Sequence, residues 1–315
     1  MSSGLRLPSP PGLLAHRQFF AMNTTVRVFA AEQVPVDLLE RAESVFHRIE
    51  RTFSRFRPDS ELSRLNAASG NEVAVSPEMF RLLQLCLAYH DRTNGLFEPA
   101  ILPNLEACGY DRSFELVPQH QHASVMPGPE ARRSLRDVKM DSIDLLVRTP
   151  RAMRLDFGGI GKGYAVDEAA QLLRPAEDFL IDAGGDISAS GDGPDGDGWT
   201  VSIADALVEG RERSIIDLRN QALATSATTR RSWIRGAVTH HHIIDPRTGR
   251  PAHTDVLAAS VIAQSATEAD VYAKPALLLG AEKALTFLAS LGVEGLLQTH
   301  NGRAITTTGW PGGVA

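Results

Sequence analysis

The fold of this chain is decided around the segment Leu155-Asp-Phe-Gly-Gly-Ile-Gly-Lys-Gly-Tyr-Ala-Val-Asp167, where a glycine-rich loop opens into a helix predicted from Tyr164 to Leu173. Glycines let backbone N–H groups approach a phosphate, and the N-terminus of a helix adds positive potential. The P-loop motif requires Ser or Thr where this chain has Gly163, and the dinucleotide fingerprint requires a third glycine where Val166 stands. The segment therefore predicts either a phosphate-binding loop of another kind or a tight strand-to-helix turn.

Long helices are predicted before this segment. Apolar residues recur every three or four positions from Leu38 to Phe53, which is typical of an amphipathic helix facing a core. Ser76-Pro77-Glu78 combines a capping hydroxyl, a first-turn proline and an acid, so we predict a second helix from there to Asn94-Gly95. Residues 111–147 lose this periodicity, which indicates a long surface excursion or a weakly ordered strand connection, and we place no chemistry there.

Short apolar and β-branched runs after the segment predict strands, and two further helices follow them. The predicted strands are Phe179–Ile181, Trp199–Ala204, Ser214–Leu218, Ala258–Ala263 and a closing Gly295–Gln298, and the predicted helices are Ala266–Leu279 and Ala281–Leu291. The order of helices, sheet and helices favours an α+β fold, with a mixed or antiparallel sheet packed against helices, over alternating βαβ units.

The composition is that of a globular protein. Of the 315 residues, 43% are hydrophobic and 22% are charged, which allows a large buried core. The net charge is −6 and the few lysines form no basic run, so nucleic-acid binding is not expected. No apolar run approaches the roughly 18 residues that span a bilayer, so no membrane segment is expected.

The N-terminal residues 1–18 are rich in proline, and their apolar patch Leu13-Leu14-Ala15 is too short for the core of a signal peptide. We therefore expect a flexible N-terminal segment over residues 1–18 and a single domain over residues 19–315. We also expect a cytoplasmic protein, or a periplasmic one if a leader has been removed.

Two further clusters are candidates for chemistry. Asp182-Ala-Gly-Gly-Asp-Ile187 follows an apolar strand, and it either brings backbone close to a ligand or forms a bulged turn. His240-His241-His242 suggests a metal, but neighbours on a strand point to opposite faces and cannot all converge. His242 alone, beside an Asp-Pro turn, is either an acid/base or binding group or a hydrogen-bonded structural histidine.

The helix predicted at Ala266–Leu279 carries Asp270 and Lys274 one turn apart. On their own, these residues form an ordinary helix ion pair. Pro275 denies an amide hydrogen to the carbonyl of Val271, so we predict that the helix kinks or begins there. Carbonyls freed in this way, beside a carboxylate, are the oxygen ligands that a hard cation prefers.

In this order and spacing, the segments resemble the ApbE family of FAD:protein FMN transferases over roughly residues 19–309. The matching segments are Phe20–Thr25, Phe53–Asn66, Thr93–Pro99, the glycine-rich loop through Asp167, Ala183–Asp186, Ala224–Ser226, His242–Gly249 and Ala269–Asp270. The resemblance implies a single ApbE-like α+β fold with FAD in a central cleft and Mg²⁺ at its pyrophosphate. It also implies transfer of the FMN moiety of FAD to a threonine or serine hydroxyl of a target flavoprotein, with release of AMP.

Residue by residue, the resemblance implies a set of site positions. The flavin-contacting positions are Met22, Phe56, Leu96, Phe97, Glu98, Asp156, Lys162 and Ile243, and the metal positions are Gly159, Asp270 and Lys274. The implied catalytic residues are Asp270, which holds the metal, and His242, which positions or deprotonates groups at the flavin phosphate.

Several residues depart from the family pattern. Lys274 stands where the family usually has a threonine, Ala227 and Thr229 replace the usual Gly and Tyr, and Glu98 replaces Asp. An ammonium group at position 274 should repel magnesium, and it should either pair with Asp270 or lie against the pyrophosphate. We therefore expect a divergent member of the family, with an FAD-binding carrier or sensor and an FAD pyrophosphatase as the alternative functions.

Overall fold

The computed structural model describes residues 14–31, 34–122 and 133–315. Contacts within the chain divide it into two compact units: unit 1 comprises Met1–Arg48, Ile160–Ala227 and Thr254–Ala315, and unit 2 comprises Ile49–Gly159 and Thr228–His253. Most of the expected N-terminal segment lies outside the described residues, but a strand already begins at Leu14, ahead of the boundary expected at residue 19. The single domain expected over residues 19–315 stays a prediction.

Unit 1 is built on an antiparallel sheet of eight strands. In spatial order they are β1 (Leu14–Ala21), β2 (Thr24–Ala31), β7 (Phe179–Ala183), β8 (Ile187–Ser190), β11 (Gln221–Ala227), β16 (Val256–Ala263), β17 (Glu294–Thr299) and β18 (Ala304–Thr306). Every neighbouring pair runs antiparallel. The α+β class predicted from the order of elements is therefore confirmed.

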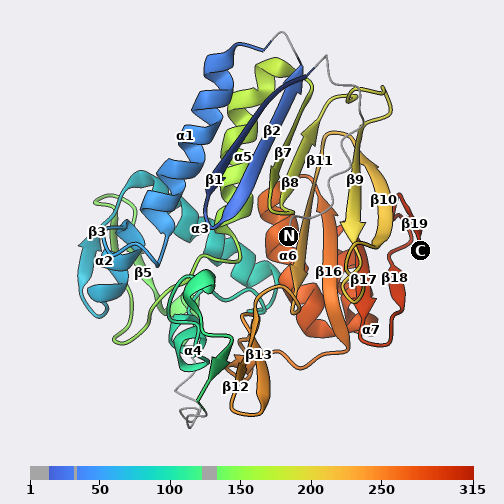
Figure 1. The fold of residues 1–315 in the computed structure, drawn as a ribbon. Coiled ribbons are helices and arrows are strands. Elements are labelled where there is room, and N and C mark those ends of the chain that lie inside the picture. The colour runs from blue at the N-terminus through green and yellow to red at the C-terminus, as the bar shows by residue number, and fades with distance from the viewer. Residues whose placement is uncertain (1–13, 32–33, 123–132) are drawn as a thin grey trace. The chain divides into compact units, whose positions relative to one another are not determined.

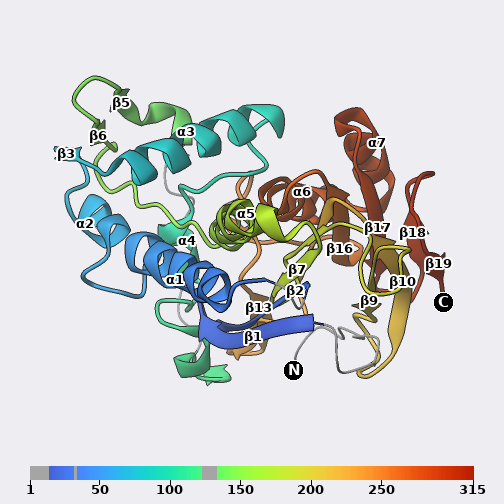
Figure 2. The same cartoon turned by 90° about the horizontal axis from the view of Figure 1, so that it is seen from above.

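Helices cover one face of this sheet (Figure 1, Figure 2). They are α5 (Gly161–Leu173), with a 3₁₀ turn η3 (Arg174–Ala176) after it, α6 (Ala266–Leu279) and α7 (Ala281–Leu291). Helix α6 packs on α5, α7, β11 and β16. Small side chains make this packing close, because Ala224, Ala263 and Ala269 form one buried cluster.

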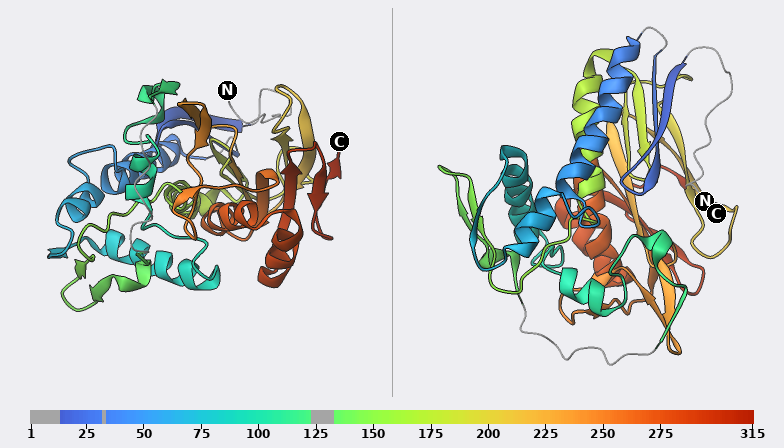
Figure 3. Two further views of the ribbon diagram at one scale, coloured as in Figure 1. Left: turned by 90° about the horizontal axis from the view of Figure 1, so that it is seen from below. Right: turned by 60° about the vertical axis from the view of Figure 1, so that its left-hand side comes forward.

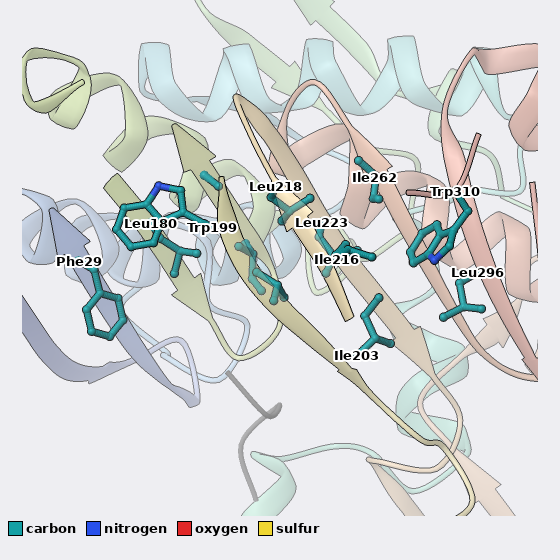
Figure 4. Packing of buried hydrophobic residues seen from close by; sticks show 13 residues of the cluster. Phe29, Leu180, Trp199, Ile203, Ile216, Leu218, Leu223, Ile262, Leu296 and Trp310 are labelled. Atoms are coloured by element: carbon teal, nitrogen blue, oxygen red, sulfur yellow. The ribbon is translucent and has the colours of Figure 1, made fainter. Parts of the chain in front are cut away.

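A second, three-stranded sheet covers the opposite face, with the order β19 (Gly313–Val314), β10 (Glu212–Leu218) and β9 (Trp199–Ala204). The core between the two sheets includes Leu223 and Ile262, whose next residues, Ala224 and Ala263, point to the helices instead. Figure 4 shows Trp199 and Trp310 in this core. The alternation along each strand is what gives the sheet its two buried faces.

Unit 2 holds the helices α2 (Glu61–Ala67), α3 (Pro77–Arg92) and α4 (Leu102–Ala107), with η1 (Phe114–Leu116) and η2 (Leu135–Asp137). Its short strands are β3 (Glu72–Ala74), β6 (Leu146–Arg148) and β5 (Lys139–Asp141) in one sheet, β13 (Val238–His241), β12 (Ser232–Arg235) and β4 (His120–Gln121) in a second, and the pair β14 (Ile244–Asp245) and β15 (Arg250–Pro251). The buried Trp233 of β12 donates to the carbonyl of Cys108 at 3.0 Å. This bond ties the β12–β13 hairpin to the end of α4, and the two elements lie side by side in Figure 1 and Figure 3.

Most elements predicted from the sequence are present. Helix α1 (Val36–Phe53), which begins in unit 1 and ends in unit 2, and helix α3 lie where their periodicity placed them. The side chain of Ser76 caps α3 by accepting from Met79 N–H at 3.1 Å. Helices α6 and α7 have the predicted bounds.

Two details were wrong. The alternative that a helix begins at Pro275 was wrong, because α6 runs through it from Ala266 to Leu279, and the alternative of a kink there stays a prediction. The proline removes only one backbone hydrogen bond, and α6 is buried along most of its length. Strand β17 does not close the chain, since β18 and β19 follow it. No helix in the described part of the chain is long and apolar enough to cross a membrane.

Candidate active site

In unit 1, the ammonium group of Lys162 forms an ion pair with the carboxylate of Asp186. Lys162 is the second residue of α5, and its side chain is 20% exposed, whereas Asp186 is 2% exposed. Burial raises the pKa of the Asp186 carboxyl, Lys162 opposes that rise, and the nearby Asp270 carboxylate adds to it. The pair therefore fixes a positive side chain at the N-terminal end of α5, where the helix dipole is also positive.

The turn that carries Asp186 is held on both sides. Gly184 and Gly185 have φ values of 69° and 99°, so both occupy the left-handed region that glycine tolerates. The N–H of Ala183 donates to the Asp186 carbonyl at 2.9 Å, and the N–H of Gly185 donates to the Asp182 carboxylate at 2.8 Å. The sequence left open a ligand-binding backbone or a simple turn, and the structure has a two-residue hairpin turn that delivers Asp186.

Met22 lies beside this turn. Met22 and Asn23 form the two-residue turn between β1 and β2, with φ values of 51° and 62°. A Cβ added to Gly184 would meet Oγ1 of Thr24 at 2.2 Å, so the β1–β2 hairpin abuts the turn of Asp186. Methionine rarely adopts a positive φ, and such strain often marks a functional position.

Asp270 approaches the same end of α5 from α6. Its side chain is buried, and one carboxylate oxygen lies 3.5 Å from the N–H of Gly163. The helices touch closely here, because a Cβ on Gly163 would lie 2.5 Å from the carbonyl oxygen of Ala266. The glycine-rich loop is thus both the start of a helix and a close helix contact. The structure brings Lys162, Asp186 and Asp270 together.

The residues suit a magnesium ion only in part. Among the described residues, no three His, Cys, Asp or Glu side chains are arranged to hold a metal ion. Magnesium in phosphoryl-transfer sites often uses one or two carboxylates, waters and substrate phosphates, so the Asp270 carboxylate fits such an ion. Lys274 is half-buried one turn later on α6 and, as an ammonium group, has no lone pair to donate.

In unit 2, Asp156 is held by Arg55. The guanidinium of Arg55 lies 2.8 Å from the Asp156 carboxylate, and both side chains are largely buried. The same guanidinium lies 4.1 Å from the ring centroid of Phe56 and 4.6 Å from that of Tyr110. Asp156 and Phe56, two of the predicted flavin positions, therefore belong to one cluster through Arg55.

Glu98 is engaged within unit 2. Its carboxylate lies 3.2 Å from Nε2 of His90 and accepts from the N–H groups of Ala100 and Leu135. The hydrogen bond from Glu98 raises the pKa of His90, although burial lowers it. Phe97 beside it is buried in the core. These contacts give Glu98 a structural role, and its predicted contact with flavin stays a prediction, as does that of the half-buried Leu96.

His240 and His241 turn to different partners, as neighbours on a strand should. The ring of His240 stacks on Trp233 with centroids 6.4 Å apart, and burial lowers its pKa. Nδ1 of His241 accepts from Ile243 N–H at 3.3 Å, so its Nε2 carries the proton and donates to the Ala252 carbonyl at 3.1 Å. His240 and His241 are thus structural, which leaves His242 as the candidate of the three. It is half-buried, just before the buried Ile243.

The predicted site positions divide between the two units. Met22, Lys162, Asp270 and Lys274 belong to unit 1, and the remaining positions, Gly159 included, belong to unit 2. Sequence reasoning missed Asp186, Arg55 and His90, which hold Lys162, Asp156 and Glu98. The signal for Asp186 was present in the Gly-Gly-Asp turn, but the side chain that it holds lies 24 residues away.

Comparisons with known proteins identify the family. A family model described as the ApbE family matches residues 22–297. A protein of Treponema pallidum named FAD:protein FMN transferase is 31% identical over 302 residues, covering 90% of this chain and 81% of its own. A protein of the same name from Vibrio cholerae is 27% identical, covering 87% and 84%.

Solved structures show the same fold. The ApbE protein of Thermotoga maritima superposes with a TM-score of 0.83 at 26% identity, covering 94% of this chain and 97% of its own. The flavin transferase ApbE of Vibrio cholerae superposes with a TM-score of 0.80 at 24% identity, covering 95% and 98%. Because the family match includes every one of the predicted site positions, from Met22 to Lys274, this chain belongs to the ApbE family.

Proposed function

We propose that this protein transfers the FMN half of FAD to a hydroxyl group of a target protein and releases AMP. The observation that carries this proposal is the ApbE match over residues 22–297, together with relatives that are named FAD:protein FMN transferase. The cluster of Lys162, Asp186 and Asp270 adds physical support, since it joins a cation and a helix N-terminus at one place.

The reaction is a phosphoryl-type transfer. The acceptor oxygen, from a threonine or serine, forms a bond to the phosphorus of the FMN half while the anhydride bond to AMP breaks. The hydroxyl proton leaves to a base, and AMP departs with the bridging oxygen. Such transfers depend mainly on positioning and on neutralising negative charge, so the residues needed are cations, helix N-termini and a base.

Lys162 supplies the cation in this proposal. Its ammonium group has three donors and forms an ion pair with the Asp186 carboxylate. The N-terminal end of α5 carries the positive end of the helix dipole, which favours an anion. Lys162 therefore binds and orients the anionic part of FAD.

Asp270 would hold a magnesium ion, while Lys274 would not be a ligand. When bound, magnesium withdraws negative charge from phosphate oxygens and so favours attack and departure. The support is the buried carboxylate of Asp270 beside the N-terminus of α5. Asp270 fixes the position of that charge, which is its contribution to catalysis.

His242 is proposed as the group that positions or deprotonates the acceptor hydroxyl. The imidazole of His241 bonds to the Ile243 N–H and to the Ala252 carbonyl, which fixes the chain on both sides of His242. An imidazole has the pKa range needed for a base near neutral pH. Because the rings of His240 and His241 have structural partners, His242 is the remaining candidate among the three histidines.

The test is incubation of the protein with FAD, magnesium and a target flavoprotein, followed by mass spectrometry of the target and chromatography of the flavins. We expect covalent FMN on the target and an equal amount of AMP. Free FMN with AMP would instead indicate an FAD pyrophosphatase, and bound but unchanged FAD would indicate a carrier or sensor. His241→Gln is the matched control for His242→Gln, which should lower the transfer rate by about a hundredfold or more.

A further inference from the structure

The search for an unassigned functional group leads to Asp186, a buried acid that contacts Lys162. Replacing a buried ion pair by apolar side chains is often neutral or stabilising, so such a pair is weak evidence of a stability device. Here the acid is 2% exposed, and two more buried carboxylates, Asp182 and Asp270, belong to the same unit. Burying several carboxylates in one unit costs folding free energy. This cost indicates that Lys162, the cation held by Asp186, has a function.

Lys162 carries its charge on a long side chain. It lies in the first turn of α5 between Gly161 and Gly163, and its side chain is 20% exposed. A lysine stem has several rotatable bonds, and about 2 kcal/mol of rotamer entropy opposes holding it in one place. The Asp186 carboxylate is the partner that the structure gives its ammonium group.

The backbone that bears Asp186 is well suited to this task. It follows the Gly184-Gly185 turn, which is closed by the bond from Ala183 N–H to the Asp186 carbonyl and locked by Asp182. The hairpin of Thr24 packs against the same turn. The backbone that carries the Asp186 carboxylate is therefore fixed, whereas the long side chain of Lys162 is flexible.

We propose that Asp186 is a positioning residue that holds the ammonium group of Lys162 in place for the anionic phosphates of FAD. This inference rests on the proposed function, because it needs FAD as the ligand of Lys162. Asp186 touches no reacting atom itself and acts only through Lys162. It follows that Asp186 loses its importance once Lys162 is removed.

The experiment is a double-mutant cycle with Asp186→Asn and Lys162→Met, read out as the Kd for FAD without acceptor and as kcat/KM for transfer. Each single variant should weaken both quantities by about tenfold or more, the size typical of a lost bond to a charged group. The double variant should be no worse than Lys162→Met alone. Losses that multiply would show that Asp186 acts independently of Lys162 and would overturn the inference.

Asp182→Asn is the matched control, because Asp182 is equally buried on the same turn but lies 3.6 Å from Arg27, and the asparagine oxygen can still accept the Gly185 N–H bond that locks the turn. Its effect should multiply with that of Lys162→Met. If Asp186→Asn does not fold, comparing the double variant with Lys162→Met still tests the inference. A further tenfold loss of FAD affinity in the double variant would overturn it. A wild-type protein that binds no FAD would overturn the proposed function and this inference with it, whereas FAD binding with independent losses would overturn the inference alone.

Discussion

At the scale of single residues, the pair of His90 and Glu98 makes the stability of unit 2 depend on pH. The hydrogen bond from Glu98 raises the pKa of His90 above its ordinary value of 6.5. A group whose pKa is raised by folding contributes stability that is present below the unfolded pKa and is lost as pH rises through the folded pKa. We therefore expect the free energy of unfolding to fall as pH rises from about 6 to 8.

The measurement is urea unfolding at a series of pH values, compared with His90→Gln. The variant keeps a polar side chain of similar size but cannot titrate. Its unfolding free energy should be flatter over the same pH range, and a wild-type slope that persists in His90→Gln would show that another group is responsible.

Asp167 is a second residue whose role can be tested by itself. Its carboxylate accepts from the N–H groups of Ala266 and Thr267 at 2.8 and 2.9 Å and from the hydroxyl of Thr267, so it caps the start of α6. Asp167→Asn turns an amide N–H₂ toward these donors and should cost about 2 kcal/mol of unfolding free energy.

Ser265→Ala is the comparison variant, since it removes the capping bond to Glu268 N–H at 3.2 Å and a hydrogen bond to Asp167, and it should cost about 1 kcal/mol. Chemical denaturation of both variants measures the two costs. An Asp167→Asn variant as stable as Ser265→Ala would contradict the assignment of Asp167 as the stronger cap.

At the scale of elements, the crossing of α5 and α6 depends on Gly163. A Cβ at this position would lie 2.5 Å from the Ala266 carbonyl oxygen and 2.9 Å from Cα of Thr267, both backbone atoms that cannot rotate away. Gly163→Ala should therefore separate the two helices and cost about 3 kcal/mol or more. Because Asp270 lies on α6, FAD binding should weaken as well.

Thermal unfolding and FAD titration measure these effects. Gly313→Ala serves as the control, since a Cβ there meets nothing within 4 Å. A Gly163→Ala variant that keeps wild-type stability would show that the helices can move apart without cost.

Elements were the part of the fold that the sequence predicted best, because their signals are local. The apolar period of α1, the Ser-Pro-Glu start of α3 and the β-branched run of β16 each lie within one stretch of chain. The contacts that build the site are not local. Arg55 pairs with Asp156, and Lys162 pairs with Asp186, although the partners are far apart in the sequence. No rule based on local spacing could have predicted these two pairs.

Resemblance supplied the candidate residues but not their partners. It pointed to Lys162 and Asp156, whereas Asp186 and Arg55 emerged only when burial showed which charges need neutralising. Pro275 is the opposite case, because its local signal suggested a helix start and the packing of α6 overrode it.

At the scale of the whole molecule, the negative charge carried by FAD must be balanced by groups of the chain. The protein is acidic, with a net charge of −6, so FAD needs local positive groups such as Lys162. Lys274 is a second cationic residue, at a position that the resemblance assigns to the metal. It stands one turn after Asp270 on α6, and an ammonium group there disfavours a second cation nearby.

Lys274→Thr should therefore strengthen the effect of magnesium on FAD binding by about tenfold, because a repulsive charge is replaced by a hydroxyl that can be a ligand. The measurement is the Kd for FAD of metal-stripped protein, by flavin fluorescence, over a magnesium series. Lys283→Thr, on the exposed face of α7, is the control and should leave the magnesium dependence as in the wild type. Identical magnesium curves for wild type and Lys274→Thr would mean that the ammonium group lies too far from the bound cation to repel it, and Lys274 would then have no part in metal use.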